Sequence, residues 1–280
     1  MQFLKKIFDF YVNSSIHVAL SVYSLVRITQ LVFHISEDNP TIYFVFFGTV
    51  FGYNFVKYDR IVRIQRFEIS PQLKAIVIIS FISFLAAGYF FFQLQSIAQV
   101  FGFVFLAITF LYTLPLFPNK KNARNWAGIK IYIVAFCWVG VTLVLPIINA
   151  EIPITFDFYL KCVQRFLLIF VLIIIFEIVD LQSDDSHLKT VPQQIGVERT
   201  KILGLVLLWV YFVLEVFNFK SHGQIKNQFC TLLLQLIIVK IIAAFLVFSN
   251  QHRSKYYTSF WVESIPIFWF FLILMFGKII

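Results

Sequence analysis

The chain has 280 residues, of which 60% are hydrophobic, 19% aromatic and only 13% charged. A soluble domain of this size could not bury so much apolar surface, so the composition excludes that class and predicts an integral membrane protein. The formal net charge of +9 does not indicate a nucleic-acid partner, because the basic residues lie in short segments between apolar runs and form no recognition module.

The chain begins with a short segment, Met1 to Tyr11, whose mixture of apolar and basic residues predicts an interfacial helix. Apolar runs of roughly the length that a membrane helix needs follow it. We expect an all-α, polytopic bundle of about nine transmembrane helices, folded as a single domain over residues 1–280. The expected spans are His17–Phe33, Ile42–Val56, Leu73–Phe92, Ile97–Leu114, Ile131–Ile148, Phe158–Val179, Ile202–Phe219, Phe229–Phe248 and Phe260–Phe276.

The distribution of basic residues predicts the orientation of these spans. If the N-terminus lies inside, 16 of the 23 Lys and Arg residues fall in inner segments. This bias places the N-terminus and the loops after the second, fourth and sixth spans on the cytoplasmic side of what we expect to be a bacterial inner membrane. Charged residues inside spans need partners, and Glu215 and Lys240 in neighbouring spans are predicted to form a structural pair.

An acidic stretch follows the sixth span. Four carboxylates occur within nine residues, at Glu177, Asp180, Asp184 and Asp185. If the helix continues past Phe176, the first three of them lie on one face. Their spacing fits two interpretations equally well, a solvated acidic cap or a site for a hard cation such as Mg²⁺, which takes carboxylate oxygens together with substrate phosphates.

Two other cytoplasmic loops combine basic residues with Asn and Tyr. Carboxylates holding Mg²⁺, opposed by Lys and Arg, are what the binding of a diphosphate requires. Cytoplasmic topology alone explains the basic residues but not the carboxylates, so the hypothesis of a binding site depends on the carboxylates. The residues of interest are Asn54, Lys57, Asp59 and Arg60 after the second span, and Tyr112, Lys120 and Lys121 after the fourth.

These features resemble the UbiA superfamily of intramembrane prenyltransferases. The nine-span layout agrees, and the segment Tyr112-Thr113-Leu114-Pro115 is similar to that family's Tyr-Ser-x-Pro segment. The family's second acidic motif, Asp-x-x-x-Asp followed by Lys-Thr-[Leu/Val]-Pro and a Gly, is matched by Asp180, Asp184, Lys189, Thr190, Pro192 and Gly196.

The resemblance implies a membrane-embedded enzyme that uses Mg²⁺ to move an isoprenyl group from an isoprenyl diphosphate to a lipophilic acceptor, which we expect to be aromatic. It implies catalytic roles for Asp180, Asp184, Tyr112 and Lys189. The metal ligands implied are Asp180 and Asp184, with Asp185, Asp59 and Glu177 as further carboxylates. Diphosphate contacts are implied for Asn54, Lys57, Arg60, Lys120 and Lys121.

The first acidic motif departs from the family pattern Asn-Asp-x-x-Asp. Phe55 follows Asn54, Tyr58 stands where the second carboxylate belongs, and Asp59 lies one residue further on, about 100° around a helix. Such a site would hold fewer Mg²⁺ ions or hold them more weakly. An alternative is therefore a catalytically impaired relative that binds lipid or organises partners. A transporter is a third interpretation, which rests only on the spans and their intramembrane charges.

Overall fold

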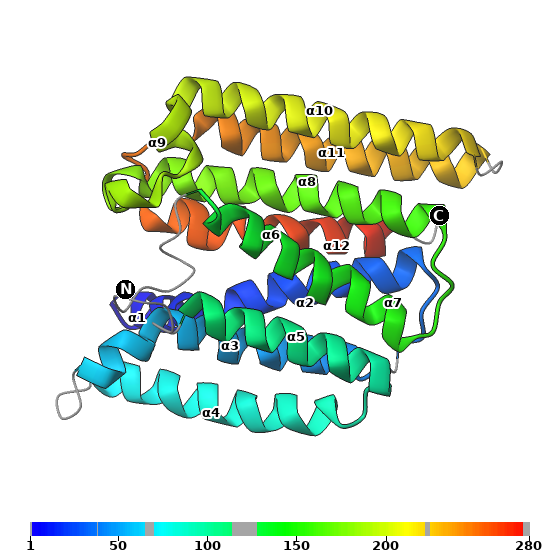
Figure 1. Ribbon diagram of the computed structural model, residues 1–280. Helices are drawn as coiled ribbons and strands as arrows, with labels where there is room; N and C mark the ends of the chain where they lie inside the picture. Colours follow the sequence, from blue (N-terminus) through cyan, green and yellow to red (C-terminus); the bar gives the residue numbers. More distant parts are fainter. Residues whose placement is uncertain (1, 38, 65–69, 114–127, 222–224, 277–280) are drawn as a thin grey trace.

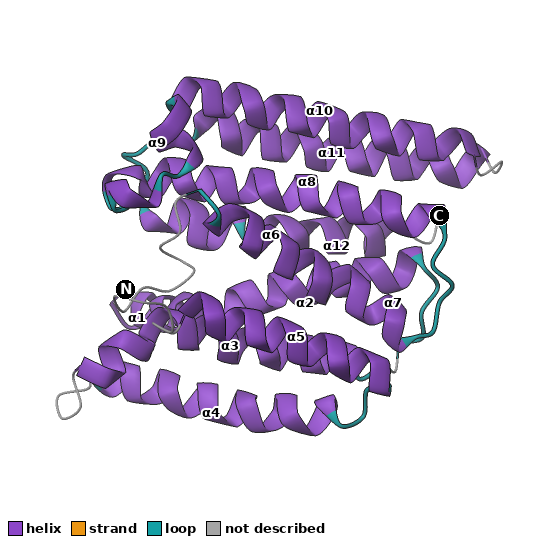
Figure 2. Ribbon diagram, viewed as in Figure 1, coloured by secondary structure: helices purple, strands orange, loops and turns teal. Residues whose placement is uncertain are grey.

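The computed structural model describes residues 2–37, 39–64, 70–113, 128–221 and 225–276, and all regular structure in these ranges is helical (Figure 2). The all-α prediction is confirmed. The long helices are α1 (Gln2–Asn13), α2 (Ile16–Val32), α3 (Thr41–Ile64), α4 (Pro71–Phe91), α5 (Ser96–Thr113), α6 (Lys130–Val139), α8 (Phe156–Val179), α10 (Val197–Ser221), α11 (Ile225–Phe248) and α12 (Ile265–Phe276).

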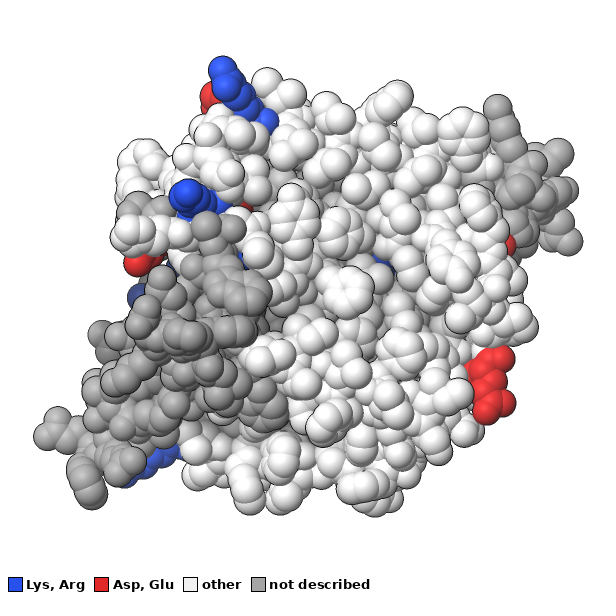
Figure 3. Space-filling view, viewed as in Figure 1, with Lys and Arg blue, Asp and Glu red and all other residues white. Residues whose placement is uncertain are grey.

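The helices are membrane-spanning in length and composition. Six helical stretches in the described chain are long and apolar enough to cross a bilayer, or seven if α1 and α2, which meet at 53°, count as one broken span. Every expected span falls on helical structure in the described chain, but the described parts of α3 and α5 are not among these stretches, so the number nine stays a prediction. Figure 3 shows a broad uncharged face, with Lys, Arg, Asp and Glu near its edges, as expected of an integral membrane protein.

Helix α8 lies at the centre of the bundle. In Figure 1, α10 and α11 pack on one side of it, while α2, α3, α5 and α4 follow on the other. The most apolar window of α8 is 67% buried, whereas the corresponding windows of α4 and α10 are 22% and 28% buried. The outer helices therefore present their apolar side chains to lipid, and α8 provides much of the interior surface.

One end of the bundle gathers the segments that the sequence placed on the cytoplasmic side. Helix α1, the short helix α9 (Val191–Ile195) and the C-terminal end of α3 lie together at this end (Figure 1). Lys130 at the start of α6 and Asp184 after α8 form an ion pair there, with 3.7 Å between Nζ and Oδ2. The acidic stretch and the beginning of α6 are thus neighbours in space, although they are far apart in sequence.

The second span is longer than predicted. Helix α3 continues without interruption to Ile64, so Asn54, Lys57, Asp59 and Arg60 lie on a helix and not in a loop. The prediction of a loop here was wrong because charged residues were taken as the end of the span, although no proline interrupts residues 41–64.

A wide helical turn interrupts the fifth span. Between α6 and α7 (Leu145–Asn149) lies the π-helix η3 (Gly140–Val144). Pro146 has no N–H to donate to the carbonyl of Thr142, and that carbonyl instead accepts from Thr29 Oγ1 at 2.8 Å. Buried Arg165 donates to Leu25 O and Thr142 Oγ1, each at 3.2 Å. The irregular turn is therefore tied to α2 and α8.

The predicted pair of Glu215 with Lys240 is wrong. Glu215 accepts from Lys161 Nζ at 2.6 Å and from Gln164 Nε2 at 2.7 Å, both on α8. Lys240 on α11 is exposed. Glu215 is buried and satisfied by two donors from the central helix, which is the arrangement expected for a structural carboxylate at membrane depth.

Gly140 is required by a close approach between helices. A Cβ added there would lie 1.9 Å from the Phe105 ring atom Cζ, closer than any real contact. We expect Gly140→Ala to displace that ring and to lower the free energy of unfolding by about 1–3 kcal/mol. Thermal unfolding in detergent checks this, with Gly48→Ala as the control, since no atom lies within 4 Å of a Cβ at Gly48. A rescue of Gly140→Ala by Phe105→Leu is expected, and its failure would contradict the account.

Candidate active site

A large apolar cavity lies between α2, α3, α4, α5, α6 and α8. Its volume is about 640 Å³, within the range of cavities that hold small-molecule ligands. Nine of the described phenylalanines line it, among them Phe51, Phe91 and Phe176. Such walls can accommodate a hydrocarbon chain, exclude water and offer π faces to a cation.

Ionisable side chains line the cavity at the end of the bundle where α8 stops. The charged residues among them are Lys130 of α6, Glu177 of α8, Asp180 of the turn that follows α8, and Glu263. Lys130 interacts electrostatically with Glu177 and Asp180 in addition to its ion pair with Asp184. The cavity therefore has an apolar body and a charged end, which is what an amphiphilic ligand with a polar head requires.

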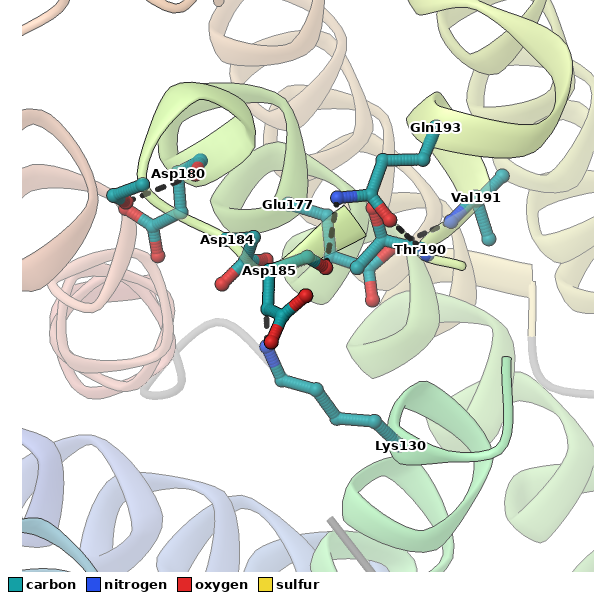
Figure 4. Close-up of polar contacts among 9 residues, drawn as sticks. Lys130, Glu177, Asp180, Asp184, Asp185, Thr190, Val191 and Gln193 are labelled. Carbon is teal, nitrogen blue, oxygen red and sulfur yellow. Dashed lines mark hydrogen bonds and ion pairs between the residues drawn. The ribbon is translucent and has the colours of Figure 1, made fainter. Parts of the chain in front are cut away.

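The chain tightens where α8 ends. Helix α8 stops at Val179, and a 3₁₀ turn η4 (Asp180–Gln182) follows. The backbone N–H groups of Ser183 and Asp184 both donate to Asp180 O, at 2.8 Å and 2.9 Å. Asp184 thus comes back towards Lys130 through a turn (Figure 4). Glu177 lies on α8, but Asp180 and Asp184 lie beyond its end. The expectation that these three carboxylates share one α-helical face was therefore wrong.

Glu177 connects the end of α8 to the start of α9. Its carboxylate is buried, with 2% of the residue exposed, and its Oε2 accepts from the N–H of Val191 at 3.0 Å (Figure 4). Gln193 Oε1 accepts from the N–H of Thr190 at 3.0 Å, which caps the same helix end. Glu177 therefore both faces the cavity and positions the segment that follows the acidic stretch.

The remaining residues of the acidic stretch point to local roles. Asp185 Oδ1 accepts from the N–H of His187 at 3.0 Å and so caps the short helix η5 (Ser186–Leu188). Lys189 is exposed and has a left-handed backbone, with φ 45°. Neither residue lines the cavity. Their predicted parts in metal binding and catalysis remain predictions.

Asn54 holds α3 to the helices beside it. Its amide accepts from Ser15 Oγ at 2.8 Å and donates to Ser14 O and Ser80 Oγ, each at 2.9 Å. The residue is 2% exposed and does not line the cavity. Its amide already has three partners, so contact with a metal or diphosphate would require some of these bonds to break. Lys57, one turn further on, interacts electrostatically with Glu263.

Several predicted site residues lie outside the part of the chain that the structure describes. The side chains of Asp59, Arg60 and Tyr112 and the whole of Lys120 and Lys121 belong to this group. The predicted roles of these residues stay predictions.

Glu263 was missed by the sequence analysis. It lines the cavity between the π-helix η6 (Tyr257–Val262) and α12. An available signal was its position inside the apolar run Phe260–Phe276, because an ionisable residue within a span is a functional candidate by default. It lies 78 residues or more beyond the acidic stretch in sequence, so spacing could not connect the two.

The acidic end suits a Mg²⁺ ion that is shared with a ligand. In the described ranges, no group of three or more His, Cys, Asp or Glu side chains could hold a metal ion alone. Mg²⁺, however, commonly takes only one or two carboxylates and completes its shell with water and substrate phosphates. Asp180 lines the cavity, and the buried Oδ2 of Asp184 accepts no hydrogen bond from a described residue, with Lys130 Nζ at 3.7 Å as its ion-pair partner. These two carboxylates fit an ion completed by a diphosphate, and they do not fit an all-protein cage.

The two contributions of Glu177 can be separated by substitution. We expect Glu177→Ala to lower the free energy of unfolding by about 1–3 kcal/mol, because the N–H of Val191 loses its acceptor. Glu177→Gln keeps an oxygen at this position and is expected to restore most of that stability. Thermal unfolding of the two variants in detergent checks the prediction, and equal destabilisation by Gln and Ala would contradict the positioning role.

No protein-family profile and no curated protein matches this sequence. Comparison with solved structures does find similar folds. A UbiA homologue from Archaeoglobus fulgidus bound to GPP and Mg²⁺ has a TM-score of 0.60 and 13% identity, over 95% of this chain and 98% of that one. The apo UbiA homologue from Aeropyrum pernix K1 has a TM-score of 0.64 and 14% identity, over 92% and 97%.

A third similar structure concerns digeranylgeranylglyceryl phosphate synthase, with a TM-score of 0.56 and 15% identity over 98% of this chain and 97% of that one. Nearly the whole length of each chain is covered, so the likeness is not confined to one part of the bundle. The UbiA-like fold that the sequence motifs indicated is confirmed. At 13–15% sequence identity, these similarities establish the fold and do not establish the activity.

Proposed function

Because this chain has the fold of the UbiA homologues, we propose that it is an intramembrane prenyltransferase. It transfers an isoprenyl group from an isoprenyl diphosphate to a lipophilic acceptor and depends on Mg²⁺. The observation that carries this proposal is the apolar cavity with Lys130, Glu177 and Asp180 at its charged end. The proposal is also supported by UbiA homologues of similar fold whose structures were determined with GPP or DMAPP and Mg²⁺ bound.

In this proposal, each end of the cavity does one task. The phenylalanine walls hold the prenyl chain and keep water from the allylic carbon as cationic character develops there. Lys130 neutralises the diphosphate, and Asp180 and Asp184 are the residues that would hold Mg²⁺. Bound there, Mg²⁺ supplies Lewis acidity that stabilises negative charge on the leaving diphosphate. Glu177 holds the start of α9 against the end of α8 through its hydrogen bond with the N–H of Val191.

The other predicted site residues, some of them outside the described part of the chain, complete the proposal. Tyr112 would place its ring near the reacting carbon, and Lys120, Lys121, Lys189, Lys57 and Arg60 would add positive charge around the diphosphate. Asp59, Asp185 and Asn54 would support the metal. The N-terminus and this end of the bundle would face the cytoplasm of a bacterial inner membrane, as the distribution of basic residues predicts.

The test is transfer by the purified protein. Labelled geranyl diphosphate is incubated with the protein and a lipid extract as the acceptor source, with Mg²⁺ or with EDTA. We expect label to enter the lipid fraction only with Mg²⁺. Binding of the diphosphate without any transfer to a range of extracts would contradict the enzymatic function.

One observation favours a second candidate, a member of this fold that binds an isoprenoid diphosphate without turnover. Asn54 is engaged by Ser14, Ser15 and Ser80, and the segment around it lacks the carboxylates at the family's two positions. Such a protein would bind the diphosphate through Lys130 and its basic neighbours, with an affinity that EDTA does not change. The assay with Mg²⁺ and EDTA separates the two candidates.

A further inference from the structure

Glu263 stands apart from the carboxylates that would hold a metal. It reaches the cavity from the C-terminal part of the chain, between η6 and α12, whereas Glu177 and Asp180 come from the end of α8. The cavity lining is mostly apolar, and Val262, the residue before Glu263, also lines it. A carboxylate is costly to keep in such surroundings unless it has a partner.

Within the described chain, Glu263 has little structural work to perform. Its carboxylate interacts electrostatically with Lys57 of α3 but accepts no hydrogen bond from another described residue. This differs from Glu177 and Glu215, whose carboxylates accept bonds that join helices. Glu263 therefore presents hydrogen-bond acceptors to the cavity that a bound molecule could use.

The backbone around Glu263 is irregular and firmly held. The N–H of Glu263 donates to Thr258 O at 3.2 Å, which is a π-type bond over five residues. His17 of α2 supports this wide turn, since its Nε2 donates to Phe260 O at 2.9 Å and its ring stacks on Phe260 at 4.8 Å between centroids. Turns of this kind often occur at functional sites, because they re-aim the side chain that follows.

From the cavity, the π-turn and a carboxyl group that accepts no hydrogen bond from a described residue, we propose that Glu263 binds the second substrate. The geometry points to an acceptor molecule that carries a hydroxyl or amine hydrogen-bond donor on a lipophilic body, with that donor directed at the Glu263 carboxylate. This inference rests on the proposed function, because it assigns the site of the molecule that receives the prenyl group. It assigns no role to Glu263 in holding the diphosphate.

A matched pair of probes tests the proposal. The radiolabelled phenol 4-octylphenol and its methyl ether 4-octylanisole share one hydrocarbon body, and only the phenol can donate to a carboxylate. The ratio of their dissociation constants is measured in detergent for the unaltered protein, for Glu263→Leu and for Glu198→Gln. Glu198 is a suitable control because its side chain is 85% exposed on α10. Partition into detergent affects all proteins equally and cancels in the comparison.

We expect the unaltered protein and Glu198→Gln to prefer the phenol by at least about tenfold, because only the phenol can donate a hydrogen bond to the Glu263 carboxyl group, whereas the ether would leave that acceptor unpaired in an apolar cavity. Glu263→Leu should reduce this preference to about twofold or less. If Glu263→Leu does not fold, Glu263→Met keeps the length of the side chain but replaces its oxygens with a weakly accepting thioether, and the preference should fall by at least about threefold. An unchanged ratio in a folded variant at this position would overturn the proposal.

A separate arm distinguishes this inference from the proposed function. Binding of geranyl S-thiolodiphosphate with Mg²⁺ is measured for the same proteins. Glu263→Leu should bind it as the unaltered protein does, and a parallel loss of this binding would overturn the assignment to the second substrate. If the unaltered protein binds no diphosphate at all, the proposed function fails, and the ratio of phenol to ether still reports on Glu263.

Discussion

Asp180→Ala is expected to lower Mg²⁺-dependent prenyl transfer by at least about 100-fold, which corresponds to about 2.7 kcal/mol of transition-state stabilisation. Asp180 is the carboxylate of the acidic stretch that follows α8 directly and lines the cavity. In the proposed function, its removal would take away an oxygen ligand of Mg²⁺ at the place where the leaving diphosphate would accumulate charge. The measurement is the initial rate of transfer of a labelled geranyl group, compared at several Mg²⁺ concentrations.

The structure offers a control for Asp180→Ala. Glu198→Gln removes an equal charge from an exposed side chain on α10 and should leave the rate within about twofold. Thermal unfolding of both variants shows whether Asp180→Ala still folds. A folded Asp180→Ala protein that transfers at the rate of the unaltered protein would remove the proposed metal site.

Lys130→Met is expected to have effects of opposite sign on two ligands. Lys130 forms an ion pair with Asp184 of the acidic stretch, and its side chain is only 20% exposed. Without it, the diphosphate loses a partly buried positive partner, and its dissociation constant should rise about 10- to 100-fold. Asp184, Asp180 and Glu177 also lose the charge that offsets their mutual repulsion, so Mg²⁺ alone should bind more tightly.

Calorimetric titration with geranyl S-thiolodiphosphate and, separately, with Mg²⁺ measures both effects. Lys201→Met is the matched control, because Lys201 pairs with exposed Glu198 at 3.6 Å on α10. Weaker binding of both ligands to Lys130→Met would mean that Lys130 holds the site together and does not contact the diphosphate.

The sequence predicted the fold well because lipid imposes a simple rule. Each span must be apolar and helical, so composition and run length reveal where the helices are. The end of α3 was misjudged because the helix continues to Ile64, past residues as polar as Lys57 and Arg60. The π-turn at Gly140–Val144 depends on a bond from Thr29 to Thr142, two residues that are distant in sequence, and local patterns cannot reveal such a bond.

The candidate site was predictable only where its residues are neighbours in sequence. Asp180, Asp184 and Glu177 were found as one cluster, but the turn that brings Asp184 to Lys130 depends on the packing of α6 beside α8. Glu263 and the partners of Asn54 were not found, since both depend on contacts between distant segments. The Asn54 example shows that an amide of a type suited to a binding site can be engaged in hydrogen bonds between helices, which its position in the sequence does not reveal.

The most direct test of the central claim is the binding of geranyl S-thiolodiphosphate to the unaltered protein and to Asp180→Asn/Asp184→Asn, with and without Mg²⁺. The account predicts that Mg²⁺ tightens binding to the unaltered protein by at least about tenfold, and that the double variant loses this enhancement while it remains folded. Equal binding by both proteins, with no response to Mg²⁺, would contradict the claim that these carboxylates hold a metal-bound diphosphate at the end of an apolar cavity.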